Sequence, residues 1–118
     1  MKAFLGVMKA LSDPNRVKII KMLQHRRLCV CEVQAALQVA QPTASKHLKV
    51  LEKAGLVWPE KDGLWVNYHL TDGAANPFVA TLLGNLRHWL EEEPDIAQIK
   101  ENLSFIRREQ HCGSKGLA

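Results

Sequence analysis

Two of the three cysteines in this chain, Cys29 and Cys31, lie one residue apart in the segment LCVCEV. Thiolates are soft ligands that select thiophilic ions, so a close cysteine pair is suited to bind such an ion. The spacing is C-x-C, and the chain contains no C-x-x-C pair of the kind that builds zinc ribbons. The third cysteine is Cys112, near the C-terminus, and an odd number of cysteines argues against a disulfide scaffold.

The C-x-C spacing places a demand on the backbone between the two thiols. In a regular helix, residues i and i+2 point about 200° apart, so Cys29 and Cys31 face the same side only where the chain is locally extended. We therefore expect the pair to lie where an extended segment turns into a helix. An ion held by both sulfurs would distort the start of that helix.

Other interpretations of these thiols remain open from the residues alone. Cysteine packs well in apolar interiors, so Cys29 and Cys31 are also suited to be small buried side chains, and Cys112 to be an idle exposed thiol. A redox or sulfur sensor, in which Cys29 oxidises with Cys112 as its partner, is a further alternative. A thiol enzyme such as a disulfide reductase needs C-x-x-C in a βαβ unit, and neither is present, so the sequence predicts no enzyme.

The chain has 118 residues, of which 47% are hydrophobic, and this is enough for one domain with its own core. No run of about 18 apolar residues is present, so the sequence predicts no transmembrane helix and no membrane partner. The apolar N-terminal stretch is interrupted by Lys9 and lacks a small-residue cleavage site, which argues against a signal peptide. We therefore expect a cytoplasmic protein in a reducing environment, where a close cysteine pair binds metal or senses redox state.

Positive charge is concentrated in the first half of the chain. Residues 1–54 contain 10 Lys and Arg against 3 Asp and Glu, a net charge of +7, whereas residues 55–118 contain 6 against 9, a net charge of −3. Together the two halves give the +4 of the whole chain. A clustered basic half is typical of proteins that bind nucleic acid. The alternative is a basic surface that is merely solvated.

The spacing of apolar residues predicts a mostly α-helical fold that contains one small β-hairpin. Asp13 is a suitable N-cap and Pro14 a suitable first residue for the second helix. The segment LWVNYHL alternates two sets of side chains, which is strand periodicity, and Asp62-Gly63 is a hairpin turn signal. The predicted elements are helices over residues 1–11, 14–24, 31–37, 42–54, 77–90 and 96–109, a hairpin over residues 56–70, and a flexible tail over residues 110–118 that carries Cys112.

The order helix, short helix, turn, basic helix and hairpin is that of a winged helix-turn-helix domain, in which the second helix of the pair lies in the DNA major groove. Helix 42–54 places Ala44, Leu48 and Leu51 within about 60° of one another as its buried face. Its opposite face supplies hydroxyls and amides for base contacts and lysines for phosphate contacts. The predicted DNA-binding residues are Gln41, Thr43, Ser45, Lys46, His47 and Lys49, with Lys61 near the hairpin tip.

Four stretches, ALSDPNRVKIIKML, LCVCEV, QPTASKHLKVLEKAGLV and KDGLWVNYHL, resemble the ArsR/SmtB family of metal-responsive repressors in order and in spacing. The resemblance covers roughly residues 8–70. It implies a homodimer built by the first helix and the helix from Pro77, in which each subunit places the helix from Pro42 on one half of a palindromic operator. It also implies a single DNA-binding and dimerisation domain over residues 1–109, and repression of a resistance operon that an inducer relieves.

Within this resemblance, the LCVC segment matches the inducer site of the arsenic and cadmium/lead branches. The cadmium/lead branch adds thiols from the N-terminal arm, but this chain has no cysteine or histidine before His25. The zinc branch uses Asp/His pairs along the dimer helix, where His88 is the only histidine. The arsenic branch needs three thiolates, and Gln34 stands where its third cysteine follows, which leaves Cys112 to complete the trio.

The resemblance therefore implies trivalent arsenic, or antimony, as an inducer and implies no organic cofactor. The implied ligands are Cys29, Cys31 and Cys112. Two alternatives keep the same fold and change the inducer: a thiol-based redox or sulfur-responsive repressor, and a cadmium/lead sensor. The implied partners are double-stranded operator DNA and a second copy of the chain.

Overall fold

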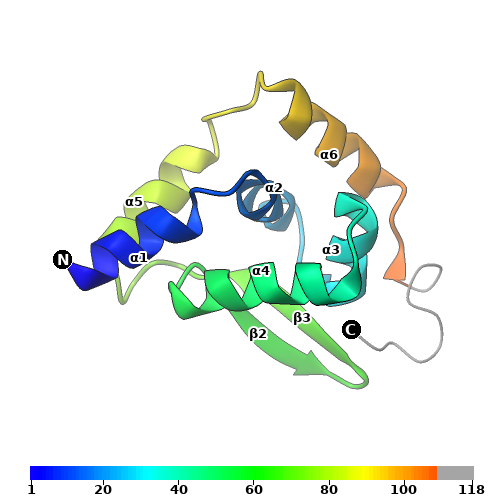
Figure 1. The fold of residues 1–118 in the computed structure, drawn as a ribbon, viewed down its shortest axis with the longest axis horizontal. Helices are drawn as coiled ribbons and strands as arrows, with labels where there is room; N and C mark the ends of the chain where they lie inside the picture. The colour runs from blue at the N-terminus through cyan, green and yellow to red at the C-terminus, as the bar shows by residue number, and fades with distance from the viewer. Residues whose placement is uncertain (109–118) are drawn as a thin grey trace.

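Helix α2 (Pro14–Leu23) lies at the centre of the structure, with the other helices arranged around it (Figure 1). The computed structural model describes residues 1–108. Asp13 precedes the helix in an extended conformation, and its carboxylate accepts hydrogen bonds from the backbone N–H groups of Asn15 and Arg16, at 2.8 and 3.2 Å. Pro14 occupies the first turn, where a backbone N–H has no helical partner to lose. The start predicted for this helix is confirmed.

Helices α1 (Lys2–Ala10) and α5 (Pro77–Leu86) lie side by side on one side of α2 (Figure 1). The first of them confirms the predicted N-terminal helix. The second starts at Asn76, whose side-chain oxygen accepts hydrogen bonds from the backbone N–H groups of Phe78 and Val79. This contact satisfies two of the N–H groups that a helix start leaves without partners.

The C-terminal end of α5 is held by Lys21, a lysine of α2 that is fully buried. Its ammonium donates hydrogen bonds to the carbonyl oxygens of Leu86 and Trp89, at 2.6 and 3.0 Å, and pairs with the Glu91 carboxylate at 3.1 Å. Cations stabilise this end of a helix because its last carbonyls lack backbone partners. The helix therefore ends at Leu86, whereas the apolar spacing predicts an end near Leu90.

Helices α3 (Val30–Leu37) and α4 (Gln41–Lys53) form the predicted helix pair. The turn between them begins at Gln38, which adopts the left-handed conformation with φ 59° and ψ 46°. The buried residues of α4 are those that the helical spacing predicts, and they pack into the core that α2 and α3 also line: Ala44, Leu48 and Leu51.

The sheet has three antiparallel strands, β1 (Leu28–Cys29), β2 (Val57–Asp62) and β3 (Trp65–Leu70), in the order β1-β3-β2. The pairing of β2 with β3 confirms the predicted hairpin, which projects beyond α4 as a wing (Figure 1). The sequence does not predict β1, because two residues are too few to show strand alternation. The wing is therefore joined through β1 to the segment that carries the thiols.

The hairpin turn lies one residue later than the sequence predicts. Asp62 pairs with Trp65, so the turn residues are Gly63 and Leu64, and Gly63 supplies the positive φ that the turn requires. Lys61 consequently lies within β2, two positions before the turn, and its side chain is exposed.

Helix α6 (Pro94–Ser104) packs against α2 and α3, and the Asn102 amide donates a hydrogen bond to the Ala36 carbonyl at 3.1 Å. The apolar spacing predicts a helix that continues to about Glu109. The helix ends earlier, at Ser104, and Ile106 packs against the core from the irregular segment that follows. The predicted tail, residues 110–118 with Cys112, lies outside the described residues. None of the helices in the described part of the chain is long and apolar enough to cross a membrane.

Candidate functional site

The sulfur atoms of Cys29 and Cys31 lie 3.3 Å apart. Cys29 ends β1 with an extended backbone (φ −87°, ψ 169°), and Cys31 lies in the first turn of α3. This is the change from extended to helical backbone that the C-x-C spacing requires, so that expectation is confirmed. Both residues are buried, with 0% and 8% of their surface exposed. Two sulfurs this close are suited to bind the same soft atom.

Glu32 fixes the backbone of the thiol pair and was not predicted as a site residue. Its buried carboxylate accepts a hydrogen bond from the backbone N–H of Cys29 at 3.0 Å and one from the Arg26 guanidinium at 2.7 Å. A Glu three residues after the cap residue is the pattern of a capping box. The spacing Cys29-x-x-Glu32 was visible in the sequence, but cysteine is not among the usual cap residues.

Burial sets the protonation state of the Cys29 thiol. Removal from water raises the pKa of Cys29 to about 11, and the nearby Glu32 carboxylate adds to that rise. The thiol is therefore neutral at physiological pH. A ligand that binds there must take the place of a thiol proton.

The thiol pair is connected to the wing through the sheet. Cys29 pairs with Asn67 of β3, a polar residue that is buried. The Asn67 side-chain oxygen accepts a hydrogen bond at 3.2 Å from the Arg108 guanidinium, which also lies 3.7 Å from the centre of the Trp65 ring. Cys29 is thus directly adjacent both to β3 of the wing and to α3.

A third ligand for a bound ion is not found within residues 1–108, where no cluster of three His, Cys, Asp or Glu side chains could hold a metal ion. Gln34, at the position where the third cysteine would follow, lies in α3 and is half-buried. The predicted third thiol, Cys112, lies outside the described residues.

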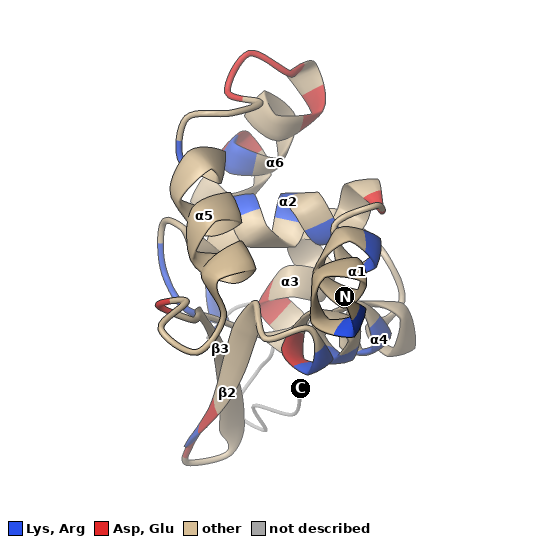
Figure 2. Ribbon diagram, turned by 90° about the vertical axis from the view of Figure 1, so that its left-hand side faces the viewer, with Lys and Arg blue, Asp and Glu red and all other residues tan. Residues whose placement is uncertain are grey.

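The polar face of α4 points away from the core, as predicted. In Figure 2, lysine and arginine residues of α1 and α4 lie on one side of the molecule, and the acidic residues between α5 and α6 lie at the opposite end. The basic residues of α1 and α4 suit contact with a polyanion. The predicted DNA-binding residues of α4 divide into the exposed Gln41, Thr43, Lys46 and Lys49 and the half-buried Ser45 and His47.

Two of these side chains have partners within the fold. The Lys49 ammonium lies 3.5 Å from the Glu52 carboxylate, and Tyr68 together with Glu52 raises the pKa of Lys49, which keeps its charge. The Arg16 guanidinium lies 3.3 Å from Nδ1 of His47, which connects α4 to the start of α2. Of Lys49 and His47, the exposed Lys49 is the more accessible for contact with a phosphate.

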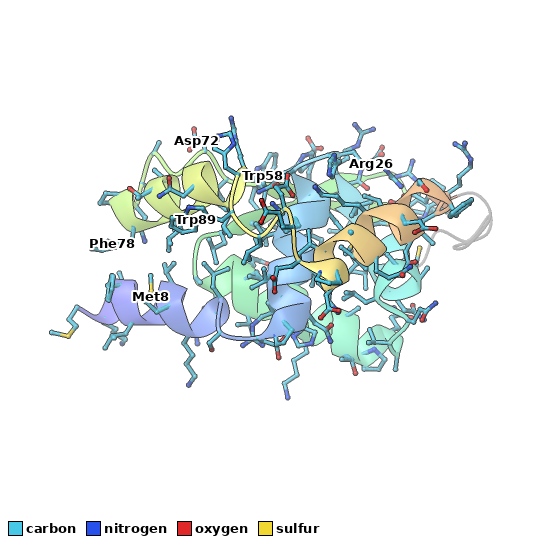
Figure 3. All side chains as sticks on the ribbon, turned by 90° about the horizontal axis from the view of Figure 1, so that it is seen from above. Met8, Arg26, Trp58, Asp72, Phe78 and Trp89 are labelled. Carbon is cyan, nitrogen blue, oxygen red and sulfur yellow. The ribbon has the colours of Figure 1, made fainter. Side chains whose placement is uncertain are left out.

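Large apolar side chains remain exposed on α1 and around α5. Phe4 and Phe78 meet edge to face, with ring centres 5.2 Å apart. Figure 3 shows Met8, Phe78 and Trp89 in the same part of the molecule. Exposed apolar patches of this kind are typical of surfaces that bind another protein. The exposed residues here are Met1, Phe4, Leu5, Phe78, Trp89 and Leu90.

A helix pair, a basic exposed helix and a three-stranded wing together define a winged helix-turn-helix transcriptional regulator. The sequence profile described as "Bacterial regulatory protein, arsR family" matches residues 13–58. The arsenical resistance operon repressor of Escherichia coli K12 is 39% identical over 103 residues, which cover 85% of this chain and 84% of that protein. The chain belongs to the arsR family of bacterial regulatory proteins, and it is a DNA-binding regulator rather than an enzyme.

Solved structures agree with this fold. HlyU from Vibrio cholerae N16961 superposes with a TM-score of 0.62 and 28% identity, covering 73% of this chain and 89% of that one. Mb0332 from Mycobacterium bovis, described as a homodimeric winged helix-turn-helix DNA-binding domain, gives a TM-score of 0.62 and 27% identity over 73% of this chain and 76% of that one. The predicted fold class is confirmed.

The comparisons do not single out the arsenic branch of the family. The repressor SmtB of Mycobacterium tuberculosis H37Rv is 42% identical over 66 residues, or 56% of this chain and 49% of that protein. The cadmium regulator CadC of Listeria innocua is 42% identical over 66 residues, or 55% of this chain and 56% of that protein. Relatives named for arsenic and cadmium are therefore similarly close, and the chain spans only about half the length of SmtB and CadC.

Proposed function

We propose that this protein is a cytoplasmic, homodimeric repressor of a resistance operon, released from double-stranded operator DNA when trivalent arsenic binds Cys29 and Cys31. The observation that carries the proposal is the 3.3 Å separation of the two sulfurs at the start of α3. That helix leads directly into α4, the predicted DNA-reading helix. A ligand that changes the distance between the two sulfurs thus acts on the start of α3, the helix that connects the thiol pair to the DNA-reading helix α4. Allosteric coupling requires such an element shared by the inducer site and the DNA-binding site.

The protonation state of the Cys29 thiol favours arsenous acid over a divalent cation. Divalent metals bind thiolates, so a thiol with a pKa of about 11 has to release its proton at neutral pH before cadmium or lead can bind. Arsenous acid instead condenses with neutral thiols and releases one water molecule for each arsenic–sulfur bond. Antimonite reacts in the same way and is the second candidate inducer.

In the proposed complex with DNA, α4 lies in the major groove and the wing beside it. Gln41, Thr43 and Ser45 contact base edges from the first turns of α4, which lie deepest in the groove. Phosphate contacts come from the basic residues of α4 and β2: Lys46, His47, Lys49 and Lys61.

The exposed apolar residues of α1 and α5 form the proposed dimer interface. They lie on neighbouring helices, so one continuous patch can meet its own copy across a two-fold axis. A dimer presents two copies of α4, which matches the two half-sites of a palindromic operator.

The first experiment is a titration of reduced protein with arsenite, followed by the ultraviolet absorption of arsenic–thiolate bonds and by release of a labelled operator fragment. Wild-type protein should show both signals, and Cys29→Ser and Cys31→Ser should lose both while still binding DNA. Cys112→Ser tests the third predicted ligand, since a signal that falls from three sulfurs per arsenic to two assigns Cys112 to the site. Absence of absorption in the wild type would rule out arsenic as the inducer.

A redox or sulfur sensor is the second candidate, because two buried sulfurs 3.3 Å apart are also placed for thiol oxidation. A structure of Vibrio cholerae HlyU described as reduced superposes with a TM-score of 0.63 and 26% identity. On this alternative, peroxide or polysulfide releases the operator in the absence of arsenite, and a reducing agent restores binding.

The remaining alternative is a cadmium/lead sensor. If the protein is such a sensor, cadmium or lead should produce metal–thiolate absorption in the same titration.

A further inference from the structure

Arg16, in the first turn of α2, joins three helices through its guanidinium. Its Nε donates a hydrogen bond to the Ala10 carbonyl at 2.7 Å, and Nη2 donates one to the Lys9 carbonyl at 3.3 Å. Its Nη1 lies 3.3 Å from Nδ1 of His47 in α4. All three nitrogens of the guanidinium therefore have a partner within the fold. Arg16 is not among the DNA-binding residues that the sequence predicts.

The contacts that Arg16 makes with α1 are at the C-terminal end of that helix. Lys9 and Ala10 belong to the last turn of α1, where carbonyls lack partners within the helix and a cation is favourable. The backbone of Arg16 is itself fixed, because its N–H donates to the Asp13 carboxylate at 3.2 Å. The guanidinium thus holds the end of α1 at a defined position relative to the start of α2.

The contact with α4 requires one particular state of the His47 ring. Arginine has only hydrogen-bond donors, so Nδ1 of His47 must be the acceptor in this bond. The ring is then neutral, with its proton on Nε2. The Nε2–H group remains a donor, which suits the phosphate contact proposed for His47. Arg16 thus orients a residue of the proposed DNA interface from within the fold.

Helices α1 and α4 have to be held in a fixed relation if a dimer is to bind two half-sites. Helix α1 carries exposed apolar residues of the proposed dimer interface, Phe4 and Leu5, and α4 is the predicted reading helix. The two helices lie next to each other on the same side of the molecule (Figure 2). In a two-fold dimer, the position of α4 relative to the interface sets the distance between the two copies of α4. That distance must match the separation of the half-sites.

Arg16 supplies a directional contact between these two helices. Met8 of α1 packs against the core, but apolar packing has no preferred direction. The planar guanidinium has fixed donor directions, so it holds the carbonyls of α1 and the ring of His47 in one arrangement. A lysine ammonium at the same position would be a point charge without this fork.

We propose that Arg16 is a positioning residue that fixes α4 relative to the dimer interface and thereby sets the half-site separation that the repressor accepts. The inference rests on the proposed function, since it requires a homodimer on a palindromic operator. It adds a determinant of operator choice that lies in α2, outside the reading helix and the wing. Without the arginine fork, α4 takes up a range of positions, and operators of different spacing become more nearly equivalent.

The test measures how strongly operator affinity depends on half-site separation. Binding sites are first selected from a random-sequence DNA library with the full-length wild-type protein in the absence of arsenite. Fluorescence anisotropy then compares the selected site, versions with one base pair added or removed between the half-sites, and a single half-site. For the wild type, the changed spacing should lower the affinity by about thirtyfold, because the second subunit no longer reaches its half-site.

Arg16→Lys keeps the charge and removes the fork. It should lower the affinity for the selected site by about tenfold and reduce the penalty for altered spacing to about threefold. The affinity for a single half-site should stay within about twofold of the wild-type value, and analytical ultracentrifugation should give the wild-type mass. A variant that loses affinity for every fragment by the same factor, single half-site included, would have only a local structural role for Arg16 and would overturn the proposal.

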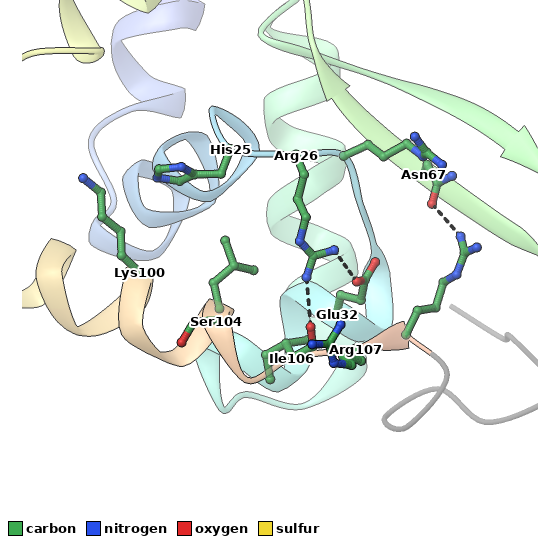
Figure 4. A pocket seen from close by; sticks show the side chains of 11 residues that line it. His25, Arg26, Glu32, Asn67, Lys100, Ser104, Ile106 and Arg107 are labelled. Atoms are coloured by element: carbon green, nitrogen blue, oxygen red, sulfur yellow. Dashed lines mark hydrogen bonds and ion pairs between the residues drawn. The ribbon is translucent and has the colours of Figure 1, made fainter.

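Arg26→Lys is the matched control, because the Arg26 guanidinium also bridges separate elements. It donates to the Glu32 carboxylate at 2.7 Å and to the Ile106 carbonyl at 3.0 Å, beside the cavity shown in Figure 4. Neither of these partners belongs to α1 or α4. This variant should keep the full wild-type penalty for altered spacing. An equal loss of the penalty in both lysine variants would show a general loosening of the fold and overturn the proposal.

His47→Ala tests the same contact from the side of α4, and it does so even if Arg16→Lys fails to fold. It should lower the overall affinity, because the phosphate contact is lost, and reduce the spacing penalty to about threefold as well. A full spacing penalty in His47→Ala would overturn the proposal.

The outcomes separate this inference from the proposed function. If the wild-type protein selects only single half-sites, the proposed dimer on a palindromic operator and the role of Arg16 both fail. If it selects paired half-sites and Arg16→Lys retains the full spacing penalty, the proposed function stands and the inference is wrong.

Discussion

At the level of single residues, the environment of Cys29 determines which reactions the thiol pair can carry out. Burial and the neighbouring Glu32 carboxylate both disfavour the thiolate, so the sulfur is a weak nucleophile at neutral pH. Glu32 is itself neutralised by Arg26. Loss of that arginine would leave an unpaired buried carboxylate next to the thiol and would disfavour the thiolate further.

The raised pKa of Cys29 predicts a distinct pH dependence of its alkylation. In a Cys31→Ser, Cys112→Ser background, the rate with iodoacetamide should rise about tenfold per pH unit from pH 8 to pH 10, because the thiolate fraction rises by that factor below the pKa. The rate should level off only near the pKa of about 11. Mass spectrometry of the alkylated protein measures the rate, with the urea-unfolded protein as the control that levels off earlier. A plateau already at pH 9 in the folded protein would contradict the burial of the Cys29 side chain.

A second prediction concerns Gln38, which adopts a left-handed conformation that glycine tolerates better. Gln38→Gly should stabilise the protein by about 1 kcal/mol, since the side-chain strain at positive φ disappears. The same substitution at Gln34, inside α3, should instead destabilise it by about 1 kcal/mol. Chemical denaturation of both variants gives the two values, and changes of the same sign would show that the turn is not strained.

At the level of elements, helix α4 holds the lysines that contact phosphates in the proposed DNA complex. The exposed lysines of α4 extend toward solvent from a helix whose other face is anchored in the core by Leu48 and Leu51. Phosphate contacts made from such a rigid helix are lost individually when a lysine is removed, without a change in the fold.

Lys49→Ala should therefore weaken binding to all DNA sequences alike and reduce the steepness of the salt dependence. Loss of one phosphate contact in each subunit lowers the slope of log K against log salt by about 2 for a dimer. Fluorescence anisotropy with operator and random fragments over a range of salt concentrations measures both effects, and Arg87→Ala serves as a charge-matched control. A slope that stays at the wild-type value would mean that α4 does not face the phosphates as proposed.

Elements with long periodic patterns and clear end signals could be predicted from the sequence, and short or non-local ones could not. Asp13 and Pro14 mark the start of α2 locally, and the closeness of Cys29 and Cys31 follows from their spacing. Strand β1 exists only because β3 lies beside it. The contact of Arg108 with Asn67 joins residues 41 positions apart, so no local pattern could reveal it.

At the level of the whole molecule, the proposed dimer depends on an apolar surface that the monomer leaves exposed. Leu5 is 53% exposed on α1, close to the other apolar residues of that face. A charge at this position would have to be buried without a partner in the dimer.

Leu5→Glu should convert the dimer to a monomer and lower operator affinity by about a hundredfold or more, because the two half-sites are then bound independently. Analytical ultracentrifugation measures the mass, and a gel-shift titration measures the affinity. Leu64→Glu introduces the same change at the wing turn and should leave the mass unchanged. A Leu5→Glu protein that remains dimeric would place the interface elsewhere.

The separation of charge between the two ends of the molecule also has a kinetic consequence. Lysine and arginine residues of α1 and α4 lie on the side proposed to meet DNA, and the acidic segment between α5 and α6 lies at the far end, so the field of a DNA duplex should attract the first and repel the second. Molecules that approach DNA therefore rotate toward the correct orientation before they touch it, and a larger share of collisions is productive. Added salt should thus slow association as well as weaken the final complex.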